Sequence, residues 1–289
     1  MNNQKVSYLL KSTKGYFSPL KCPSCGTVGG MTVDRKYLVT RLIRCKECFL
    51  LYRHPVDSPD FNDTYYNSDY VEPDGITTDL PSEQQLAVWK ELNFMNSGKN
   101  ISSHIKAVET ILGPLTGLKL VDYGANWGYG SYQWKQRALV VESYELARDR
   151  ASFGKNLGLS IKTKEEDISK GNDIFYSSHV IEHLPSVKHM LDVARRSLHQ
   201  DGIFVAFCPN GSEAFRKRHP GNFHRGWGLV HPNYLTGEFY QRAFASNPYF
   251  ISSSPYEIDS VNLNQVQYVG NLEGDELMVI AKINSSFRG

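Results

Sequence analysis

The stretch LVDYGANWGYGS, residues 120–131, decides the fold, because it passes from a buried strand through a glycine turn into a helix. Residues 118–122 have the apolar pattern of a buried strand, and Gly124, Gly128 and Gly130 follow it. Glycines at such a turn let the backbone come close to a ligand, and the N-terminus of the next helix favours a negatively charged group. The stretch therefore predicts a ligand-binding turn at the carboxyl end of the first strand of an α/β sheet.

A carboxylate at the end of the next strand strengthens this interpretation. Glu145 ends the predicted strand 138–145, about twenty residues after the turn, where a ribose diol needs a bidentate acceptor. Glu142 takes this place if the strand ends earlier. The alternative is a structural glycine turn followed by a surface glutamate.

Strand and helix patterns alternate on both sides of this turn. Such alternation is typical of a parallel sheet covered by helices. The last apolar segment, 275–283, follows a stretch without an obvious crossover helix, so we expect it to enter the sheet antiparallel. The sequence predicts helices over 83–95, 101–112, 129–137, 147–158 and 187–202, and strands over 118–124, 138–145, 172–178 and 203–210.

Four of the five cysteines form a C-x2-C-x19-C-x2-C pattern, at Cys22, Cys25, Cys45 and Cys48. Two such knuckles can deliver four thiolates to one Zn2+ ion. Four protein ligands leave no open position for water, so the pattern predicts a structural zinc ribbon. The alternative is four unrelated core cysteines, which is what we expect of Cys208 in its apolar strand.

Length and composition set limits on the remaining classes. A chain of 289 residues suits two units, and we expect a four-cysteine ribbon over 1–55, a connector or flap with helices over 56–104, and the main α/β domain over 105–289. No apolar run approaches the ~20 residues that cross a bilayer, and the first twenty residues lack a secretory pattern. We therefore expect a cytoplasmic protein without a membrane span. The net charge of +2 argues against a nucleic-acid partner.

Four segments carry a family resemblance. VDYGANWGYGSYQ, VVESYELARDRA, DIFYSSHVIEHL and FVAFCPNGS resemble, in order and spacing, the successive motifs of class I S-adenosylmethionine-dependent methyltransferases. The resemblance covers about residues 105–289. It implies a Rossmann-like α/β fold with a seven-stranded sheet whose last strand is antiparallel.

The same resemblance implies a set of residues that bind S-adenosylmethionine. The family's first motif reads roughly D-x-G-x-G-x-G, and Asn126 replaces its middle glycine, which is tolerable because Asn adopts positive φ more readily than most residues. An acidic residue after the third strand often meets the adenine amine, and Glu166 or Asp167 fits that place. The implied cofactor-binding residues are Asp122, Gly124, Asn126, Gly128, Glu145, Asp167 and Ser178.

The N-terminal part resembles a bacterial subgroup of these enzymes. CPSCG, RCKECFLLYRHPV and FNDTYYNSDY are similar to the zinc-ribbon opening of that subgroup, which tends to act in sugar and surface-glycan pathways. Phe49 stands where the subgroup usually has Gly, and His54 where it often has Asn. The resemblance implies a small-molecule acceptor, a sugar or nucleotide sugar.

Methyl transfer from a sulfonium requires the enzyme to align a nucleophile and to remove its proton. Histidine suits the second task because its pKa lies near neutrality. His179 and His183 lie one helical turn apart after the predicted strand 172–178, and His231 and Tyr234 follow the fifth strand. We expect His231 and His183 to be the base and the acceptor contact, with Glu182, His179 and Tyr234 in support. The alternative for each histidine is a packed structural side chain.

Other functions remain open at this point. Sugar C-methyltransferases share the zinc opening but carry a long additional C-terminal domain, and Val230 stands where they commonly have an acidic residue, so O-methylation is favoured. An RNA methyltransferase, a non-catalytic zinc-ribbon adaptor and an NAD-dependent dehydrogenase are the other candidates. The basic run 215–226 is either a solvated loop or, beside the acceptor cleft, a grip for a diphosphate.

Overall fold

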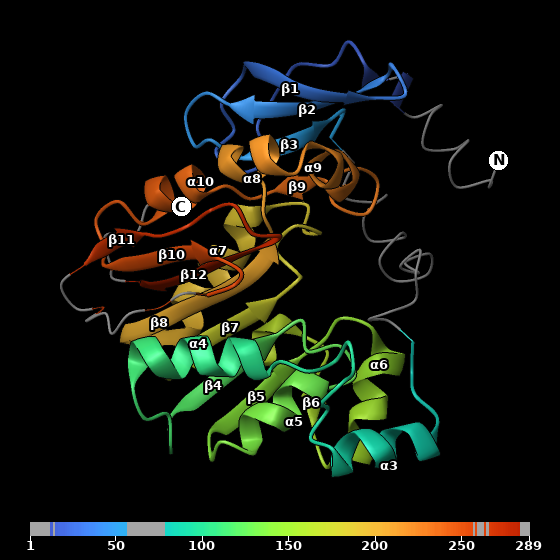
Figure 1. Cartoon of the computed structure of the whole chain (residues 1–289), viewed down its shortest axis with the longest axis vertical. Helices are drawn as coiled ribbons and strands as arrows, with labels where there is room; N and C mark the ends of the chain where they lie inside the picture. Colours follow the sequence, from blue (N-terminus) through green and yellow to red (C-terminus); the bar gives the residue numbers. More distant parts are fainter. Residues whose placement is uncertain are drawn as a thin grey trace.

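The structure is a computed structural model that describes residues 12–13, 15–56, 79–256, 258, 263 and 266–283. It contains a large sheet flanked by helices and a smaller sheet at one end of the molecule (Figure 1). The expected flap segment FNDTYYNSDY falls within 57–78, outside the described residues. In the described part of the chain, no helix has both the length and the apolar character needed to cross a membrane.

The large sheet has the strand order β11-β10-β12-β8-β7-β4-β5-β6. Strands β4, β5, β6, β7 and β8 are parallel, and β12 is antiparallel to both of its neighbours, β8 and β10. This confirms the expected Rossmann-like sheet with an antiparallel last strand, to which the short β11 adds an edge. The strands are β4 (Lys119–Tyr123), β5 (Val140–Tyr144), β6 (Ile161–Lys162), β7 (Asn172–Ser178), β8 (Leu198–Pro209), β10 (Tyr249–Ser253), β11 (Gln267–Val269) and β12 (Glu276–Lys282).

Helices cover both faces of this sheet. On one face α7 and α10 pack against inward side chains such as Phe204 and Cys208, and on the other α4 and α5 pack against Val205 and Phe207. Alternate residues of β8 thus serve opposite cores, as the period of a strand requires. The helices are α3 (Glu83–Glu91), α4 (Ser102–Leu112), α5 (Tyr129–Lys135), α6 (Arg148–Phe153), α7 (Val187–Ser197), α8 (Glu213–Arg218), α9 (Pro220–Gly226) and α10 (Gly237–Ala243).

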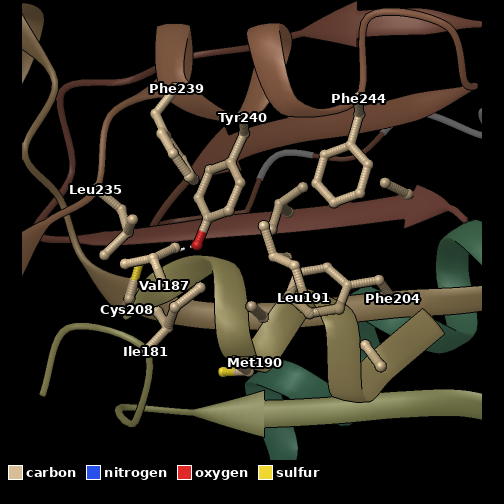
Figure 2. Packing of buried hydrophobic residues seen from close by; sticks show 14 of the residues in the cluster. Ile181, Val187, Met190, Leu191, Phe204, Cys208, Leu235, Phe239, Tyr240 and Phe244 are labelled. Carbon is tan, nitrogen blue, oxygen red and sulfur yellow. Dashed lines mark hydrogen bonds between the residues drawn. The ribbon is translucent and has the colours of Figure 1, made fainter. Parts of the chain in front are cut away.

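Figure 2 shows the core between α7, α10 and the sheet. Aromatic rings of α10 and β8 stack against aliphatic side chains of α7, and Cys208 lies among them with its sulfur 3.6 Å from the Tyr240 hydroxyl. Cys208 is fully buried and does not belong to the group formed by the other four cysteines. It is a small core residue, as the sequence predicted.

The predicted helix 187–202 is too long. Helix α7 ends at Ser197 because Leu198 is extended and opens β8 by pairing with Asn172. In the large sheet three short strands, β6, β10 and β11, were not predicted. In β10 the sequence YFISS buries two serines, so its polar residues conceal a strand that is buried throughout.

The four-cysteine ribbon forms a second sheet with the order β1-β2-β3-β9. Strands β1 (Gly30–Lys36), β2 (Thr40–Cys45) and β3 (Leu51–His54) come from the N-terminal part, but β9 (Asn233–Tyr234) comes from the C-terminal half and pairs antiparallel with β3. In Figure 1 this sheet lies against α8 and α9. The ribbon is therefore joined directly to the segment that precedes β9, which contains His231.

Candidate active site

A cavity of about 1000 Å³ opens at the carboxyl ends of β4, β5 and β7, the edge at which open α/β sheets bind ligands. It brings together the glycine turn and the histidine segments, which are separated by many residues in the sequence. Its lining residues are Gly98, Asn100, Ile101, His104, Tyr123, Gly124, Asn126, Tyr129, Tyr144, Glu145, Leu146, Ala147, Arg150, Glu165, Ser178, His179, Val180, His183, Leu184, Pro185, Ser186, Lys188, His189, Asp192, His231 and Glu276.

The glycine turn forms one wall of this cavity. Gly124 has φ +81°, and a Cβ atom placed on it would come within 2.3 Å of Val180 Cγ2, so only glycine fits there. Asn126 has φ +53°, the positive value that the sequence analysis expected of it. Its side chain accepts a hydrogen bond from the Trp127 N–H at 2.8 Å, which fixes the turn.

Glu145 is held rigidly at the same end. Its Oε2 accepts from the Asn126 N–H at 3.0 Å and its Oε1 from the Ala147 N–H at 2.8 Å, and it is 7% exposed. The Arg150 guanidinium lies 3.9 Å from the carboxylate. Glu142, the second choice, is turned to Lys162 and the Ser169 N–H and does not line the cavity.

Three of the predicted cofactor-binding residues do not line this cavity. Asp122 is buried beneath the turn, where its Oδ2 accepts a hydrogen bond from Ser131 Oγ at 2.6 Å, and burial raises its pKa to about 6. Gly128 is needed for packing, because a Cβ would lie 2.5 Å from Leu159 Cδ1. Asp167 is exposed, and Glu165, which the sequence analysis did not single out, lines the cavity near that segment.

At the histidine end of the cavity His179 contacts two carboxylates. Its Nε2 donates to Glu276 Oε1 at 2.6 Å, and its Nδ1 lies 3.4 Å from Glu182 Oε1. Burial opposes protonation, but the two carboxylates outweigh it and raise the pKa of His179. Burial likewise favours the neutral form of Glu182, and contact with His179 lowers its pKa to about 2 nonetheless. The three side chains form an ion-pair network.

His183 and His231 face each other beside this network. Their ring centroids are 4.7 Å apart at an interplanar angle of 60°. His183 Nδ1 donates to the Val230 carbonyl at 2.9 Å, and His231 Nδ1 donates to the Gly226 carbonyl at 2.8 Å. A carbonyl can only accept, so in the neutral ring the lone pair resides on Nε2. Burial lowers the pKa of His183 to about 4, which keeps this imidazole neutral near pH 7.

Glu276 and His104 also line the cavity, and neither was predicted from the sequence to do so. His104 lies on α4, stacks on Phe207 at 3.7 Å, and contacts the Tyr176 hydroxyl at 2.9 Å and Glu276 Oε2 at 3.0 Å. His104 lies on the buried face of a predicted helix, and this position could have indicated that its side chain faces the interior. Glu276 carried no such signal, because its partners lie far away in the sequence.

Tyr234 is not in the cavity. It is 1% exposed and packs against Phe223 at 5.0 Å in a cluster with Leu51 and Trp227. No residue of the basic run 215–226 lines the cavity either. Within that run Arg216 donates to the Val33 carbonyl of the ribbon at 3.0 Å.

The ribbon supports the loop that carries His231. Arg53 is 2% exposed, and its guanidinium donates to the Gly228 carbonyl at 2.9 Å and the Leu229 carbonyl at 3.3 Å. The Arg53 N–H donates to the Pro232 carbonyl at 2.7 Å. Asp34 accepts from Trp227 Nε1 at 2.9 Å. The residues on both sides of His231 are thus tied to β1 and β3.

The four thiols of the ribbon lie within 4.8 Å of one another. The sulfurs of Cys22 and Cys48 are 3.6 Å apart and those of Cys25 and Cys45 are 3.5 Å apart, without a disulfide. Four sulfurs at about 2.3 Å from one Zn2+ ion would be about 3.8 Å apart. The donor set and its spacing fit a tetrahedral thiolate site.

No protein-family model matches the chain, and no curated protein matches it significantly. Solved structures with similar folds are a putative S-adenosylmethionine-dependent methyltransferase from Listeria monocytogenes (13% identity, 64% of this chain and 100% of that chain, TM-score 0.45) and the geranyl diphosphate C-methyltransferase from Streptomyces coelicolor A3(2), solved with Mg2+, geranyl diphosphate and S-adenosyl-L-homocysteine (16%, 78% and 99%, 0.48). A third is the plantazolicin methyltransferase BpumL, solved with a pentazolic desmethylPZN analog and SAH (12%, 78% and 95%, 0.49). The large sheet has a Rossmann-like strand order, and the chain also carries a group of four cysteines in its N-terminal ribbon.

Proposed function

We propose that the chain is an S-adenosylmethionine-dependent methyltransferase that methylates a hydroxyl of a small acceptor, a sugar or nucleotide sugar. The observation that carries the proposal is the single cavity that joins the glycine turn and Glu145 at one end to the histidine cluster at the other. A donor and an acceptor bound at these two ends would meet inside the same cavity, which is the alignment that group transfer requires.

The glycine-turn end fits S-adenosylmethionine. Gly124 keeps the wall free of a side chain, and the pinned carboxylate of Glu145 offers lone pairs to a ribose diol. In this proposal Gly124, Asn126, Glu145 and Ser178 hold the donor, while Asp122 and Gly128 shape the turn from below. The donor supplies an electrophilic methyl group, whose bond to sulfur breaks with the electron pair left on sulfur.

The histidine end receives the acceptor. His183 and His231 contact its hydroxyl, and the hydroxyl proton leaves through the cluster that they form with Glu182. His179 and Glu276 keep Glu182 in place through the ion-pair network. Tyr234 supports this end from a distance by packing under the loop of His231.

The ribbon binds structural zinc in this proposal, through Cys22, Cys25, Cys45 and Cys48. The thiol spacing supports it, and a closed thiolate shell supplies folding energy to a segment too small for a core of its own. The choice of a sugar acceptor rests on the resemblance of the ribbon opening to the glycan-pathway subgroup. The polar side chains of Lys188, His189 and Asp192 at the cavity are compatible with a hydroxyl-rich ligand.

The proposal is tested by incubating the zinc-loaded chain with S-adenosylmethionine labelled in the methyl group and with a panel of nucleotide sugars. We expect label in a sugar hydroxyl, and its loss in His231→Ala but not in His199→Ala, an exposed histidine outside the cavity. Label entering only RNA would overturn the acceptor class. Absence of donor binding would overturn the enzyme assignment itself.

A further inference from the structure

A second group of potential metal ligands lies at the histidine end of the cavity. One ligand atom from each of Glu182, His183 and His231 lies within 4.8 Å of the others. We infer that these three side chains bind one divalent cation, separate from the zinc of the ribbon. The role of the cation in activating the acceptor rests on the proposed function, whereas its binding does not.

The first observation concerns Glu182. Its side chain is fully buried, and in the described part of the chain neither carboxylate oxygen accepts a hydrogen bond. The nearest nitrogens, His179 Nδ1 and His183 Nε2, are 3.4 and 3.8 Å from Oε1, at ion-pair rather than hydrogen-bond distance. Burying a carboxylate is costly unless its oxygens are satisfied. A cation between Glu182 and the two histidines satisfies them.

The second observation concerns how the two histidines are held. Each donates Nδ1–H to a backbone carbonyl, which fixes the ring and places its lone pair on Nε2, the nitrogen that we infer to bind the cation. Metal-binding histidines are oriented by this kind of hydrogen bond from the other ring nitrogen. Several other described histidines instead contact carboxylates: His104, His179, His189, His199 and His224.

Two carboxylates lie in or beside the cluster. Glu182 belongs to it, and Glu276 contacts His179, whose Nδ1 lies 3.4 Å from Glu182 Oε1. His104 also contacts Glu276, at 3.0 Å. Glu182 thus supplies a carboxylate oxygen beside the two imidazole ligands.

The ligand set indicates the class of ion and its chemistry. Two imidazoles and one carboxylate suit Zn2+, Fe2+, Co2+ or Mn2+, and three protein ligands leave coordination positions open. His231 and His183 line the cavity, so an open position faces the acceptor side. In the cation-bound form the two histidines act as ligands instead of as the base, and a hydroxyl bound at the open position loses its proton to water more easily than a free one. The oxygen then forms the new bond to the methyl carbon as the carbon–sulfur bond of the donor breaks.

The binding test uses Mn2+ and the full chain carrying one equivalent of thiolate-bound zinc. Mn2+ binds thiolates weakly and does not displace that zinc. We expect electron paramagnetic resonance to detect one additional Mn2+ site with couplings to two imidazole nitrogens. A parallel equilibrium dialysis with Zn2+ should reach two equivalents per chain.

The key variants are Glu182→Gln and His231→Ala. We expect each to weaken cation binding by more than about 100-fold. Mutating a residue that only hydrogen-bonds to a metal ligand already lowers metal affinity by about 10–100-fold, and loss of a ligand itself should cost more. Glu213→Gln, an exposed glutamate on α8, is the matched control and should bind as the unmodified chain does. S-Adenosylhomocysteine binding reports that each variant is folded. The inference would be overturned if the chain bound neither Mn2+ nor Zn2+ beyond the zinc held by the thiolates. It would also be overturned if Glu182→Gln bound the cation as tightly as the unmodified chain.

A chelator test separates this inference from the proposed function. After mild chelation that leaves one equivalent of zinc, we expect methyl transfer to fall at least tenfold and to return on adding Mn2+ or Zn2+. Undiminished transfer would refute the role of the cation and leave the methyltransferase proposal standing. Cation binding without any binding of S-adenosylmethionine would refute the methyltransferase proposal and leave the metal site standing.

Discussion

The two ends of the cavity are built in different ways. The glycine-turn end uses mainly one continuous stretch, from Gly124 to Ala147, joined by backbone hydrogen bonds to Glu145, and adds Ser178 from the end of β7. The histidine end assembles His183, His231 and Glu276 from three distant segments, and β3 of the ribbon supports the loop of His231. We therefore expect binding of the methyl donor at the glycine-turn end (the donor end) to be independent of the ribbon. Binding and reaction of the acceptor at the histidine end (the acceptor end) should depend on it.

Removing a histidine should break the acceptor end alone, with the largest effect. We expect His231→Ala to lower the rate of methyl transfer by about 1000-fold, in the range typical of lost proton removal or positioning. The dissociation constant for S-adenosylmethionine should stay within about threefold, since His231 belongs to the other end. Single-turnover kinetics and calorimetry measure the two quantities. A large loss of donor binding would contradict the separation of the ends.

Removing the pinned carboxylate should produce the opposite pattern. We expect Glu145→Ala to weaken donor binding by about 100-fold. The substitution removes two hydrogen bonds from the ribose hydroxyls to a charged carboxylate, and it also removes the contacts that order the turn. Transfer at saturating donor should fall much less. Glu142→Ala is the matched control, because Glu142 lies on β5, the strand that directly precedes Glu145 in the chain, and outside the cavity. Equal effects of the two substitutions would contradict the role of Glu145.

Loosening the ribbon contact should affect the acceptor end moderately. Arg53→Met keeps most of the buried volume but removes the donors to Gly228 and Leu229. We expect the turnover number to fall about tenfold, as for the loss of one well-placed contact, with no change in donor affinity. Hydrogen exchange should increase over 226–234. Arg44→Met, on β2 of the same ribbon, is the control that should leave exchange in this loop unchanged.

A buried carboxylate under the donor end gives the smallest effect, and it depends on pH. The pKa of Asp122 is raised by burial to about 6, above its ordinary value of 3.8, so ionisation destabilises the folded state. Ionisation of Asp122 therefore lowers the free energy of unfolding as pH rises from about 4 to above 6. Between pH 5 and pH 8 we expect the unmodified chain to lose about 1 kcal/mol relative to Asp122→Asn. Urea unfolding of both proteins at each pH measures the difference.

The sequence predicted the geometry of the glycine-turn end better than that of the histidine end, for a physical reason. The glycine turn, the strand before it and Glu145 are local features whose geometry follows from backbone sterics and strand period. The main strands, the antiparallel last strand and the four-cysteine group were predicted in the same way. Strand β6 was missed because two residues are too few to carry a pattern, and β10 because its two buried serines conceal one.

The arrangement of the histidine end could not be derived from local patterns. Glu276 reaches His179 only because β12 enters the sheet between β8 and β10. The pairing of β3 with β9 sets the place of His231 and buries Tyr234, which the sequence predicted to support the catalytic histidines. Both contacts depend on tertiary packing. Likewise, the spacing of acidic residues in 165–167 did not tell which carboxylate would face the cavity.

The most direct test of the account is a calorimetric titration of the zinc-loaded chain with S-adenosylmethionine. The account predicts one site per chain, an affinity that His231→Ala leaves intact, and a clear loss of affinity in Glu145→Ala. The account would be contradicted if the unmodified chain did not bind S-adenosylmethionine, or if Glu145→Ala bound it with unchanged affinity.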